Sequence, residues 1–541
     1  MTIPRWRPLT ALPLLAALFA CSGLPSPSPP PAVEVGGGPR LALLIVVDQL
    51  AADTLERARP ALRHGLARLL AEGAVFDALH AHGRPETAPG HATLATGRHP
   101  AQHGIVENAW WDRAHARRAR AVIGSDGEVS PVHLLTDAIG DWLQRAQPAA
   151  VVVTASAKDR AAVLLGGQRP DAAFWLDEKS GRFRTSRYYL QATPAWLTAW
   201  EREHGLARRF GEAWEPLPLP DGLDAAALGF APVAGDPFTR PLPRSVGRLD
   251  PALGEGFFTA AYRTPWPDEQ VALLAYELLD RYALGADGVP DLLALSFSTL
   301  DFIGHEYGPH SPESLDVVLR IDRLVGDLLA ELDRRFGPDG YVLAFSADHG
   351  VTPLPERVGS PFRRVGSEQV RCLQGVEREL AARHGQRGWF IDGFTLDPAL
   401  LAKAGLEAEA VAAEAATLIA ACPGVARVLT AAELARGPGE DDPVALAISR
   451  SFRPERSPDL FVHWEEGLLP LLGRGTTHAT AWQYDRRVPL VVLGPGVVPG
   501  RRAEPAATVD LAPTLAALLG VPVPADVAGR PLPVGEPPNG G

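Results

Sequence analysis

Short apolar runs recur along most of the chain, and they constrain its fold more than any other feature. Each is rich in aliphatic or β-branched residues without polar alternation, which is typical of strands buried on both faces of a parallel sheet. Segments with helical spacing lie between them. Strands that alternate with helices predict an α/β domain, with a mostly parallel central sheet and helices on both faces. The expected strands are residues 41–47, 150–154, 291–297, 341–346 and 488–493, and the clearest helices are residues 54–72, 312–336 and 508–519.

Two long stretches interrupt this rhythm. Residues 170–265 are rich in Trp, Tyr, Pro and Gly, and residues 355–465 contain helical and short strand patterns before the core pattern returns. We expect both to be cap insertions over the carboxyl edge of the sheet, where open α/β sheets bind ligands. The sequence therefore predicts one domain over residues 40–530, followed by a loose tail over residues 531–541.

The N-terminus has the pattern of a targeting segment. Two arginines precede an apolar run over residues 9–20, which is too short to span a bilayer and suits the core of a signal peptide. Residues 1–21 resemble a bacterial lipoprotein signal in which Cys21 is lipidated, and residues 22–39 form a Pro- and Gly-rich tether. Plain secretion is the alternative, because Phe19 is unusual at its position. Both predict export to the periplasm, with outer-membrane anchoring if Cys21 carries lipid.

Cysteine use and charge narrow the function classes. Besides Cys21 the chain has Cys372 and Cys422, which in an oxidising compartment either pair or remain as two buried thiols. The formal charge of −12 leaves no basic footprint, so we expect no nucleic-acid binding. A lipid anchor is the only membrane association expected, and the sequence does not indicate an oligomeric state.

Carboxylates and imidazoles gather where the predicted strands end or begin. Because the carboxyl ends of parallel strands share one edge of the sheet, we expect these side chains to lie close together. Each alone is ordinary as a turn former or helix cap, but together they are the ligand set of a zinc-type divalent site. The residues are Asp48, Asp301, His305, Asp348, His349 and His478.

A candidate nucleophile lies in the segment RPETAPGHATLATG, residues 84–97. Thr87 precedes Ala88 and Pro89 and then an apolar helical run, so helix N-capping is a sufficient account of it. The same place favours chemistry, because exposed N–H groups and the helix dipole attract a phosphoryl group. A metal ion bound to the hydroxyl oxygen would make it a nucleophile near neutral pH.

Several longer segments, in conserved order and spacing along nearly the whole mature chain, resemble the alkaline phosphatase superfamily. The similarity is greatest to the phosphate-irrepressible bacterial alkaline phosphatases that use a threonine nucleophile, and it implies an alkaline phosphatase-like fold. The segments are VVDQL (46–50), TAPGHATLATG (87–97), HGIVENAWWD (103–112), SAKDRAAVLLGG (156–167), STLDFIGHEYGPHS (298–311), SADHG (346–350) and GTTHATAWQYDRRVPL (475–490).

The resemblance implies a phosphomonoesterase with two Zn²⁺ ions per chain. It would release inorganic phosphate from small phosphate monoesters through a phospho-threonine at Thr87. One zinc would be bound by Asp301, His305 and His478. The other would be bound by Asp48, Asp348 and His349, with Thr87 as a further ligand.

The resemblance also implies a phosphate-binding role for Asn108, Lys158 and Arg160. Without it, Asn108 is a turn former, and Lys158 and Arg160 belong to a solvated turn. If the backbone there is extended, the two cations share one face. They favour the dianion of a monoester over a diester, and the related nucleotide pyrophosphatase/phosphodiesterases lack this pair.

Three other functions compete with this interpretation. A sulfatase is excluded, because TAPGH lacks the Cys/Ser-x-Pro-x-Arg signature. A nucleotide pyrophosphatase/phosphodiesterase-like diesterase is the main alternative. A non-catalytic zinc-binding surface lipoprotein is more remote, since such a protein should have lost the nucleophile or a ligand.

Two residues depart from the family pattern. Glu86 precedes Thr87 where an aromatic or small hydroxyl residue is more usual, and Ala479 follows His478 where Gly is common. We expect the remaining motif histidines to be structural. These are His91, His103 and His310.

Overall fold

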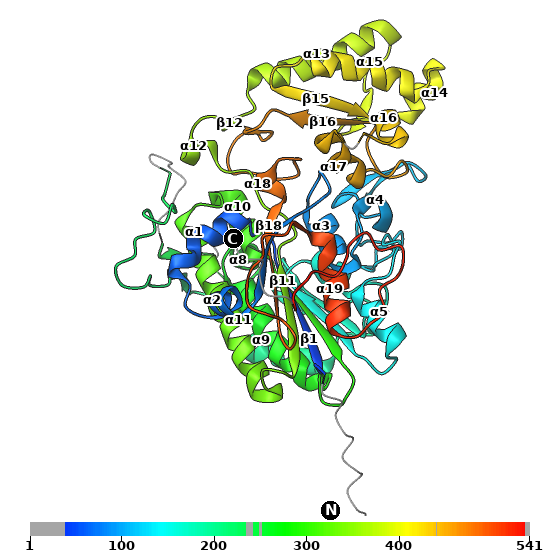
Figure 1. Cartoon of the computed structure of the whole chain (residues 1–541). Coiled ribbons are helices and arrows are strands. Elements are labelled where there is room, and N and C mark those ends of the chain that lie inside the picture. The colour runs from blue at the N-terminus through cyan, green and yellow to red at the C-terminus, as the bar shows by residue number, and fades with distance from the viewer. Residues whose placement is uncertain (1–37, 234–241, 248–251, 440, 536–541) are drawn as a thin grey trace, which may run out of the picture. The chain divides into compact units, whose positions relative to one another are not determined.

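The computed structural model describes residues 38–233, 242–247, 252–439 and 441–535, and within them ten strands form one central sheet (Figure 1). The strand order is β19-β2-β18-β11-β1-β10-β5-β6-β7, with β20 beside β2. The parallel centre is made of β11 (Tyr341–Ser346), β1 (Leu41–Val47), β10 (Asp291–Phe297), β5 (Val152–Ser156) and β6 (Ala172–Asp177). The flanking strands are β18 (Arg487–Leu493), β2 (Ala74–Leu79), β7 (Arg182–Arg184), β19 (Gly500–Arg501) and β20 (Ala506–Ala507).

The predicted α/β fold is confirmed, and each predicted strand is present. Every residue of β1 is fully buried, as the unbroken apolar run LALLIVV requires. The direction of β18 is a new finding, since it runs antiparallel to both β11 and β2. Its start therefore lies at the edge where the parallel strands end.

The assignment of residues 170–265 to a cap is wrong at its beginning. β6 and β7 extend the central sheet, and β6 pairs in parallel with β5. Trp175, one of the aromatic residues that suggested an irregular insertion, instead lies in β6 and is buried there, next to the fully enclosed Phe174. The later elements of this stretch are α7 (Ala195–His204), η2 (Leu206–Arg209), β8 (Ala213–Trp214), β9 (Arg244–Ser245) and α8 (Glu255–Ala261).

Helices cover both faces of the sheet, as Figure 1 shows. One group is α1 (Ala52–Ala58), α2 (Gly65–Glu72), α9 (Trp266–Arg281), α10 (Thr299–Tyr307) and α11 (Pro312–Phe336). The other is α3 (Thr87–Thr96), α5 (Ile139–Ala146), α6 (Asp159–Gly166) and α19 (Leu511–Leu518). The single helix predicted over residues 54–72 is wrong, because Pro60 has no N–H to continue α1 and a short 3₁₀ turn separates α1 from α2.

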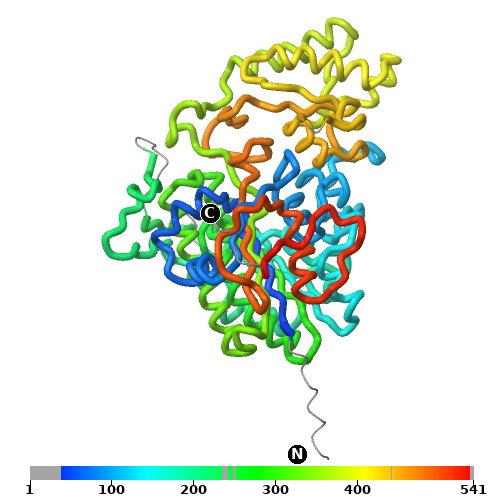
Figure 2. The backbone as a smooth tube through the Cα atoms, viewed as in Figure 1, coloured from blue at the N-terminus to red at the C-terminus, as the bar shows by residue number. Residues whose placement is uncertain are grey.

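Residues 355–465 form a separate group of elements, which we call the cap segment. Within the described residues it adds no strand to the central sheet, and Figure 2 shows it in yellow as an excursion between β11 and β18. Its own apolar cluster surrounds Trp389 and Leu380. Its larger elements are α13 (Ser367–His384), α14 (Pro398–Ala404), α15 (Ala408–Ala420), α16 (Ala431–Arg436), α17 (Pro443–Ser451) and the antiparallel pair β15 (Val425–Thr430) and β16 (Leu460–Trp464).

The two ends of the chain differ in what the structure describes. The predicted signal peptide, the lipid anchor on Cys21 and nearly all of the tether lie outside the described residues. The tail expected from residue 531 is not loose at its start, since Leu532 and Val534 are buried and the Val534 carbonyl accepts from Val498 N at 2.8 Å.

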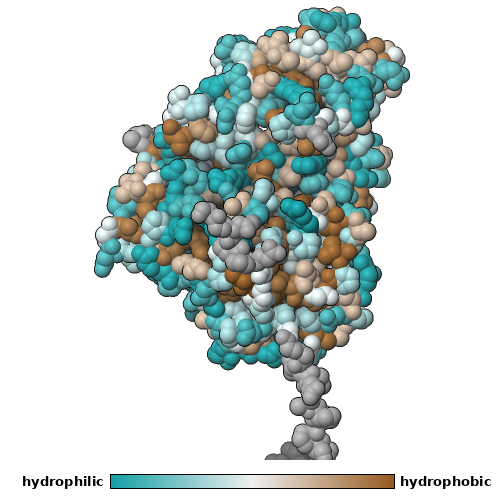
Figure 3. Space-filling model, in the orientation of Figure 1, coloured by the Kyte–Doolittle hydropathy of each residue, from teal (hydrophilic) through white to brown (hydrophobic). Residues whose placement is uncertain are grey.

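Among the described helices, none combines the length and apolar character needed to cross a bilayer. On the face in Figure 3, apolar residues are interspersed among hydrophilic ones.

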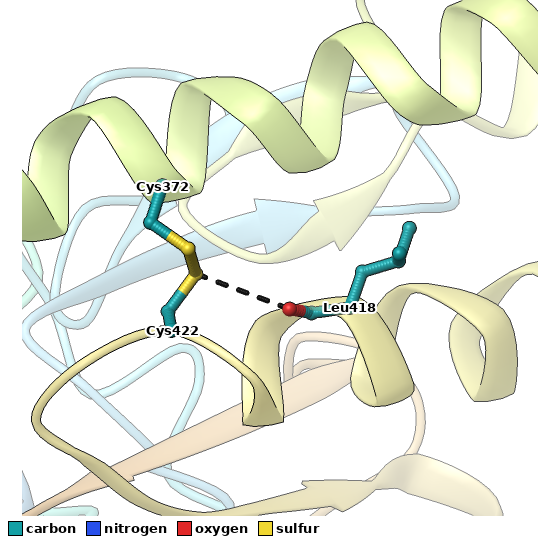
Figure 4. The surroundings of a disulfide bond; sticks show 3 residues. All are labelled: Cys372, Leu418 and Cys422. Atoms are coloured by element: carbon teal, nitrogen blue, oxygen red, sulfur yellow. Dashed lines mark hydrogen bonds between the residues drawn. A yellow bond between two sulfur atoms is a disulfide. The ribbon is translucent and has the colours of Figure 1, made fainter.

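A disulfide joins Cys372 of α13 to Cys422 just after α15, with an S–S distance of 2.05 Å (Figure 4). Of the two alternatives, paired cysteines are therefore confirmed. The bond lies inside the cap segment and closes a loop with a sequence separation of 50 residues. The bond links α13 to the end of α15, and these two helices enclose the small apolar cluster of the cap segment.

We predict that replacing both Cys372 and Cys422 by Ser destabilises the cap segment by ~4 kcal/mol, because the unfolded loop regains conformational entropy. Limited proteolysis and hydrogen exchange should show faster opening within residues 355–465, with little change in β1 and β10. Wild-type protein treated with a reductant is the matched control and should behave like the double variant. Unchanged protection of the cap segment would contradict the prediction.

Candidate active site

The carboxyl edge of the sheet brings together every residue predicted for the site. β1, β5, β10 and β11 all end at this edge, and β18 begins there because it is antiparallel. This direction explains how His478 joins the site although it precedes its strand. The assembled residues are Asp48, Thr87, Asn108, Lys158, Arg160, Asp301, His305, Asp348, His349 and His478.

The first ligand cluster contains Asp48, Asp348 and His349, all fully buried. His349 Nε2 lies 3.4 Å from Asp48 Oδ1 and 3.5 Å from Asp348 Oδ2. Among the described residues, these three atoms have no hydrogen-bond partner. Buried polar atoms that converge without partners are costly unless another group binds them.

The second ligand cluster contains Asp301, His305 and His478. Asp301 Oδ1 lies 3.1 Å from His305 Nε2 and 3.9 Å from His478 Nε2. His349 stacks on His478 with ring centroids 3.7 Å apart, and it also lies within ligand distance of Asp301 and His478. The two clusters therefore adjoin each other, with His349 between them.

The three imidazoles share one orientation. Nδ1 of His305, His349 and His478 contacts the backbone carbonyl of Thr476, Gly350 and Pro85, at 2.8, 2.9 and 2.9 Å respectively. A carbonyl at Nδ1 fixes the proton there and leaves Nε2 with a free lone pair, the usual arrangement of metal-binding histidine.

Lys158 lies between the two clusters. Its Nζ donates to Asp48 Oδ2 at 2.6 Å and to Asp301 Oδ2 at 2.5 Å, and it is 3.4 Å from Thr87 Oγ1. The contact with both carboxylates was not predicted from the sequence, which assigned Lys158 to phosphate alone. Arg160 Nη2 lies 3.5 Å from Thr87 Oγ1. Both cations therefore face the candidate nucleophile.

The charges in the site shift one another's pKa. Burial and the nearby charge of Asp48 raise the pKa of Asp348. Burial would lower the pKa of His349, but the carboxylates of Asp348 and Asp48 raise it to about 9. Burial would also lower the pKa of Lys158, and the carboxylates of Asp301 and Asp48 reverse this. Independently of these shifts, buried carboxylates and imidazoles that converge in this way form a donor set that fits one or more divalent cations.

Thr87 does not cap the helix that follows it. It is the first residue of α3, the N-cap position belongs to Glu86, and within the described residues neither side chain accepts a capping bond. The bond comes instead from Asn108, whose Oδ1 accepts from Ala88 N at 2.8 Å. A Cβ at Gly90 would lie 2.1 Å from the carbonyl oxygen of Asp348, so only glycine allows α3 to approach this loop.

Gln49 was missed by the sequence analysis. Its backbone N–H donates to Asp348 Oδ1 at 3.0 Å and its Nε2 donates to Asp301 Oδ1 at 2.7 Å, so it orients one carboxylate in each cluster. The sequence feature that could have identified Gln49 is its position in VVDQL, directly after Asp48. Its left-handed φ of 69°, which turns the side chain into the site, is not visible in the sequence.

Two further buried carboxylates, also missed, position the ligand loops. Asp268 accepts from Ser298 N at 2.7 Å at the start of α10, and burial raises its pKa to about 7. Asp485 accepts from Thr480 N at 2.9 Å and from Thr352 Oγ1 at 3.1 Å, and burial raises its pKa to about 7 as well. Asp485 thereby connects the loop of His478 to the loop that follows His349.

The histidines expected to be structural have ordinary partners. His91 Nε2 contacts Ser296 Oγ at 2.8 Å, and His103 Nε2 contacts Thr93 Oγ1 at 3.1 Å. His310 pairs with Asp53 at 3.1 Å, away from both clusters. His91 Nδ1 contacts the carbonyl of Thr87 at 2.8 Å and lies 3.2 Å from Asp348 Oδ2 without a hydrogen bond to it.

A cavity of about 590 Å³ adjoins the site. Asn108 and His478 belong to its wall, as do Phe394 and Phe461 of the cap segment and Trp110 of β3 (Ala109–Asp112). Its volume is typical of a small-molecule site. The cap segment therefore helps to enclose the space next to the two ligand clusters.

With this geometry established, the comparisons define the class of protein. The family model for type I phosphodiesterase/nucleotide pyrophosphatase matches residues 42–480, so the chain belongs to this family within the alkaline phosphatase superfamily. The particular resemblance is to alkaline phosphatases, and the chain is a phosphoric monoester hydrolase.

Similarity to named phosphatases extends over nearly the whole chain. It is 30% identical to alkaline phosphatase PhoK of Sphingomonas sp over 90% of this chain and 89% of the relative. It is 27% identical to alkaline phosphatase PafA of Elizabethkingia meningoseptica over 91% and 94%. The crystal structure of PafA superposes with a TM-score of 0.81 at 25% identity, covering 92% of this chain and 98% of PafA. Human ectonucleotide pyrophosphatase/phosphodiesterase family member 7 is 41% identical, but over only 13% of this chain and 15% of its own.

Ala479 has a left-handed φ of 77°, which explains why glycine is common at this position. We predict that Ala479→Gly raises the free energy of unfolding by about 1 kcal/mol, because the side chain no longer strains the backbone. Chemical denaturation measures the change. Ala283→Gly is the matched control, since Ala283 has a φ of 50° and is not part of the site. A loss of stability in Ala479→Gly would contradict the assignment of strain.

Proposed function

We propose that the chain is a two-zinc phosphomonoesterase that acts through a phospho-threonine at Thr87 and releases inorganic phosphate. One observation supports this most directly. Thr87 Oγ1 lies within 3.4 and 3.5 Å of two cations that face the two carboxylate–histidine clusters. Helix capping does not account for this hydroxyl, because Thr87 does not cap its helix.

The two zinc ions would be bound by the clusters around Asp48 and Asp301, and when bound they supply Lewis acidity toward the phosphate and the nucleophile. Thr87 Oγ1 attacks phosphorus, a Thr87 Oγ1–P bond forms, and the ester P–O bond opposite breaks. The leaving alkoxide departs into the cavity beside His478 and takes up one proton, which balances the proton that Thr87 Oγ1 loses as it attacks. Water then attacks the phospho-threonine, which restores the Thr87 hydroxyl and frees phosphate.

Three side chains would bind the non-bridging oxygens of the phosphoryl group. Asn108 is held with Oδ1 on the N–H of Ala88, which leaves its Nδ2 group as the donor available to substrate. The Lys158 ammonium supplies a compact positive charge, and the planar Arg160 guanidinium can donate two hydrogen bonds to phosphate oxygens. A monoester dianion uses both charges, whereas a diester carries one charge fewer and a second substituent in the same space.

The diesterase alternative has weaker support. The relatives named alkaline phosphatases match about nine-tenths of the chain, while the ectonucleotide pyrophosphatase/phosphodiesterase matches 69 residues. A non-catalytic zinc-binding lipoprotein is disfavoured, because such a protein should have lost the candidate nucleophile or a candidate ligand, and the sequence retains Thr87 and all six candidate ligand residues. We further propose an exported protein, periplasmic or anchored in the outer membrane through Cys21, and cell fractionation with a Cys21→Ser variant tests this.

We predict that Thr87→Ala lowers turnover of a phosphate monoester by at least about 1,000-fold, since no attacking oxygen remains. Metal analysis of the purified variant should show a content close to that of the wild type, because the carboxylate and imidazole ligands are unchanged. Thr87→Ser is the matched control and should retain measurable turnover. Wild-type activity in Thr87→Ala would exclude Thr87 as the nucleophile.

We predict that Lys158→Ala and Arg160→Ala lower kcat/KM for a phosphate monoester by about 100-fold or more, and far less for a bis-aryl diester. Steady-state kinetics on both substrates measures the ratio. Arg263→Ala, at a half-exposed arginine outside the site, is the control for general effects of losing a cation. Equal losses on both substrates would contradict the role of the two cations in selecting monoesters.

A further inference from the structure

Glu86 stands at the N-cap position of α3, directly before Thr87, but its carboxylate does not cap that helix. Its Oε2 instead accepts a hydrogen bond from the backbone N–H of Asn108 at 2.8 Å. The two residues are far enough apart in sequence that this contact joins two separate loops. A bond between a carboxylate and a backbone N–H is charge-assisted and stronger than a neutral one.

Asn108 is fixed at three points. Its N–H donates to Glu86, its carbonyl accepts from Ala121 N at 3.0 Å, and its Oδ1 accepts from Ala88 N at 2.8 Å. The contact with Ala88 sets which face of the amide carries the donors. The contact with Glu86 fixes the main chain that carries this amide. Without it, Asn108 itself keeps one main-chain hydrogen bond, the one from Ala121 N.

The carboxylate of Glu86 is itself held in place. Arg84 Nη2 lies 3.9 Å from Glu86 Oε1 and 3.1 Å from Glu107 Oε1. The Arg84 guanidinium also lies over the ring of Phe461 in the cap segment, 5.7 Å from its centroid. A continuous set of contacts thus runs from the cap segment through Arg84 and Glu86 to Asn108.

The cap segment holds the same loop at a second place. The backbone N–H groups of Gly83 and Arg84 both donate to Ser451 Oγ at 3.1 Å, and Gly83 N donates to the carbonyl of Ala447 at 2.7 Å. The segment leading into Thr87 is therefore anchored on α17 while its Glu86 anchors Asn108.

We propose that Glu86 is a positioning residue that acts through Asn108, fixing its amide at the phosphoryl group. This inference rests on the proposed function, in which Asn108 binds a phosphate oxygen. In this role Glu86 does not touch the phosphate, because its carboxylate accepts the N–H of Asn108 and lies near the Arg84 guanidinium. These two contacts explain how an acidic residue is tolerated beside an anionic substrate.

The test compares Glu86→Ala with Glu86→Gln. Gln retains an acceptor oxygen for Asn108 N, so we expect it to stay within about threefold of the wild type. We expect Glu86→Ala to lower kcat/KM for a phosphate monoester by about tenfold, and to raise the inhibition constant of inorganic phosphate by a similar factor. Thermal unfolding of each variant checks that the domain is folded.

A double-mutant cycle with Asn108→Ala separates positioning from a general structural role. In the Asn108→Ala background, Glu86→Ala should change kcat/KM and phosphate inhibition by less than about twofold, because the side-chain amide that Glu86 positions is absent. Glu433→Ala is the matched control. Glu433 also accepts from a backbone N–H, that of Thr430 at 2.7 Å, but lies outside the site.

Equal losses from Glu86→Ala in both backgrounds would overturn the proposal, as would an unchanged inhibition constant for phosphate. A Glu86→Gln variant as impaired as Glu86→Ala would overturn it too, because the retained acceptor would then have no value. Turnover of a phosphate monoester by the wild type tests the proposed function separately. An active wild type with an additive cycle therefore counts against Glu86 alone.

Discussion

The constraint on which this structure depends is the burial of three carboxylates at one edge of a sheet. Asp48, Asp301 and Asp348 are almost completely enclosed. Lys158 pairs directly with Asp48 and Asp301, and His349 lies beside Asp48 and Asp348. Buried charges in this excess are unfavourable unless cations neutralise them. The orientation of the histidines and the unpartnered carboxylate oxygens are consistent with that need. The fold supplies a rigid edge, because each carboxylate follows a strand that is buried on both faces.

The rest of the site is built to keep these groups from relaxing. Gln49 connects the two clusters, and Asp268 and Asp485 hold the loops that follow them. Ser451 of the cap segment accepts backbone hydrogen bonds from the loop before Thr87. Preorganised donors and charges stabilise a transition state without rearranging during the reaction. The residues that hold the candidate ligands and the loop before Thr87 therefore come from both the sheet region and the cap segment.

The sequence predicted those parts of the fold and site whose evidence is local. Unbroken apolar runs identified the central strands, and the motifs identified each candidate ligand of the two clusters. β6 was missed because its aromatic residues resembled an irregular insertion, and the direction of β18 depends on the connection through the cap segment rather than on its own residues. Glu86 could not be placed because its partner, Asn108, belongs to another loop. The contact of Lys158 with two carboxylates likewise arises only when distant strands meet.

The order of strands in the sheet has a consequence for how the chain folds during synthesis. β2 pairs only with strands that come after residue 486 within the described residues, yet it leads directly into the helix that begins at Thr87. During synthesis, more than 400 further residues must therefore be added after β2 before the strands that pair with it exist. The helix that begins at Thr87 also packs against η3 (Thr508–Asp510) and α19, which follow β18 in the chain. The sheet and the packing of this helix are therefore completed only when almost the whole chain has been made.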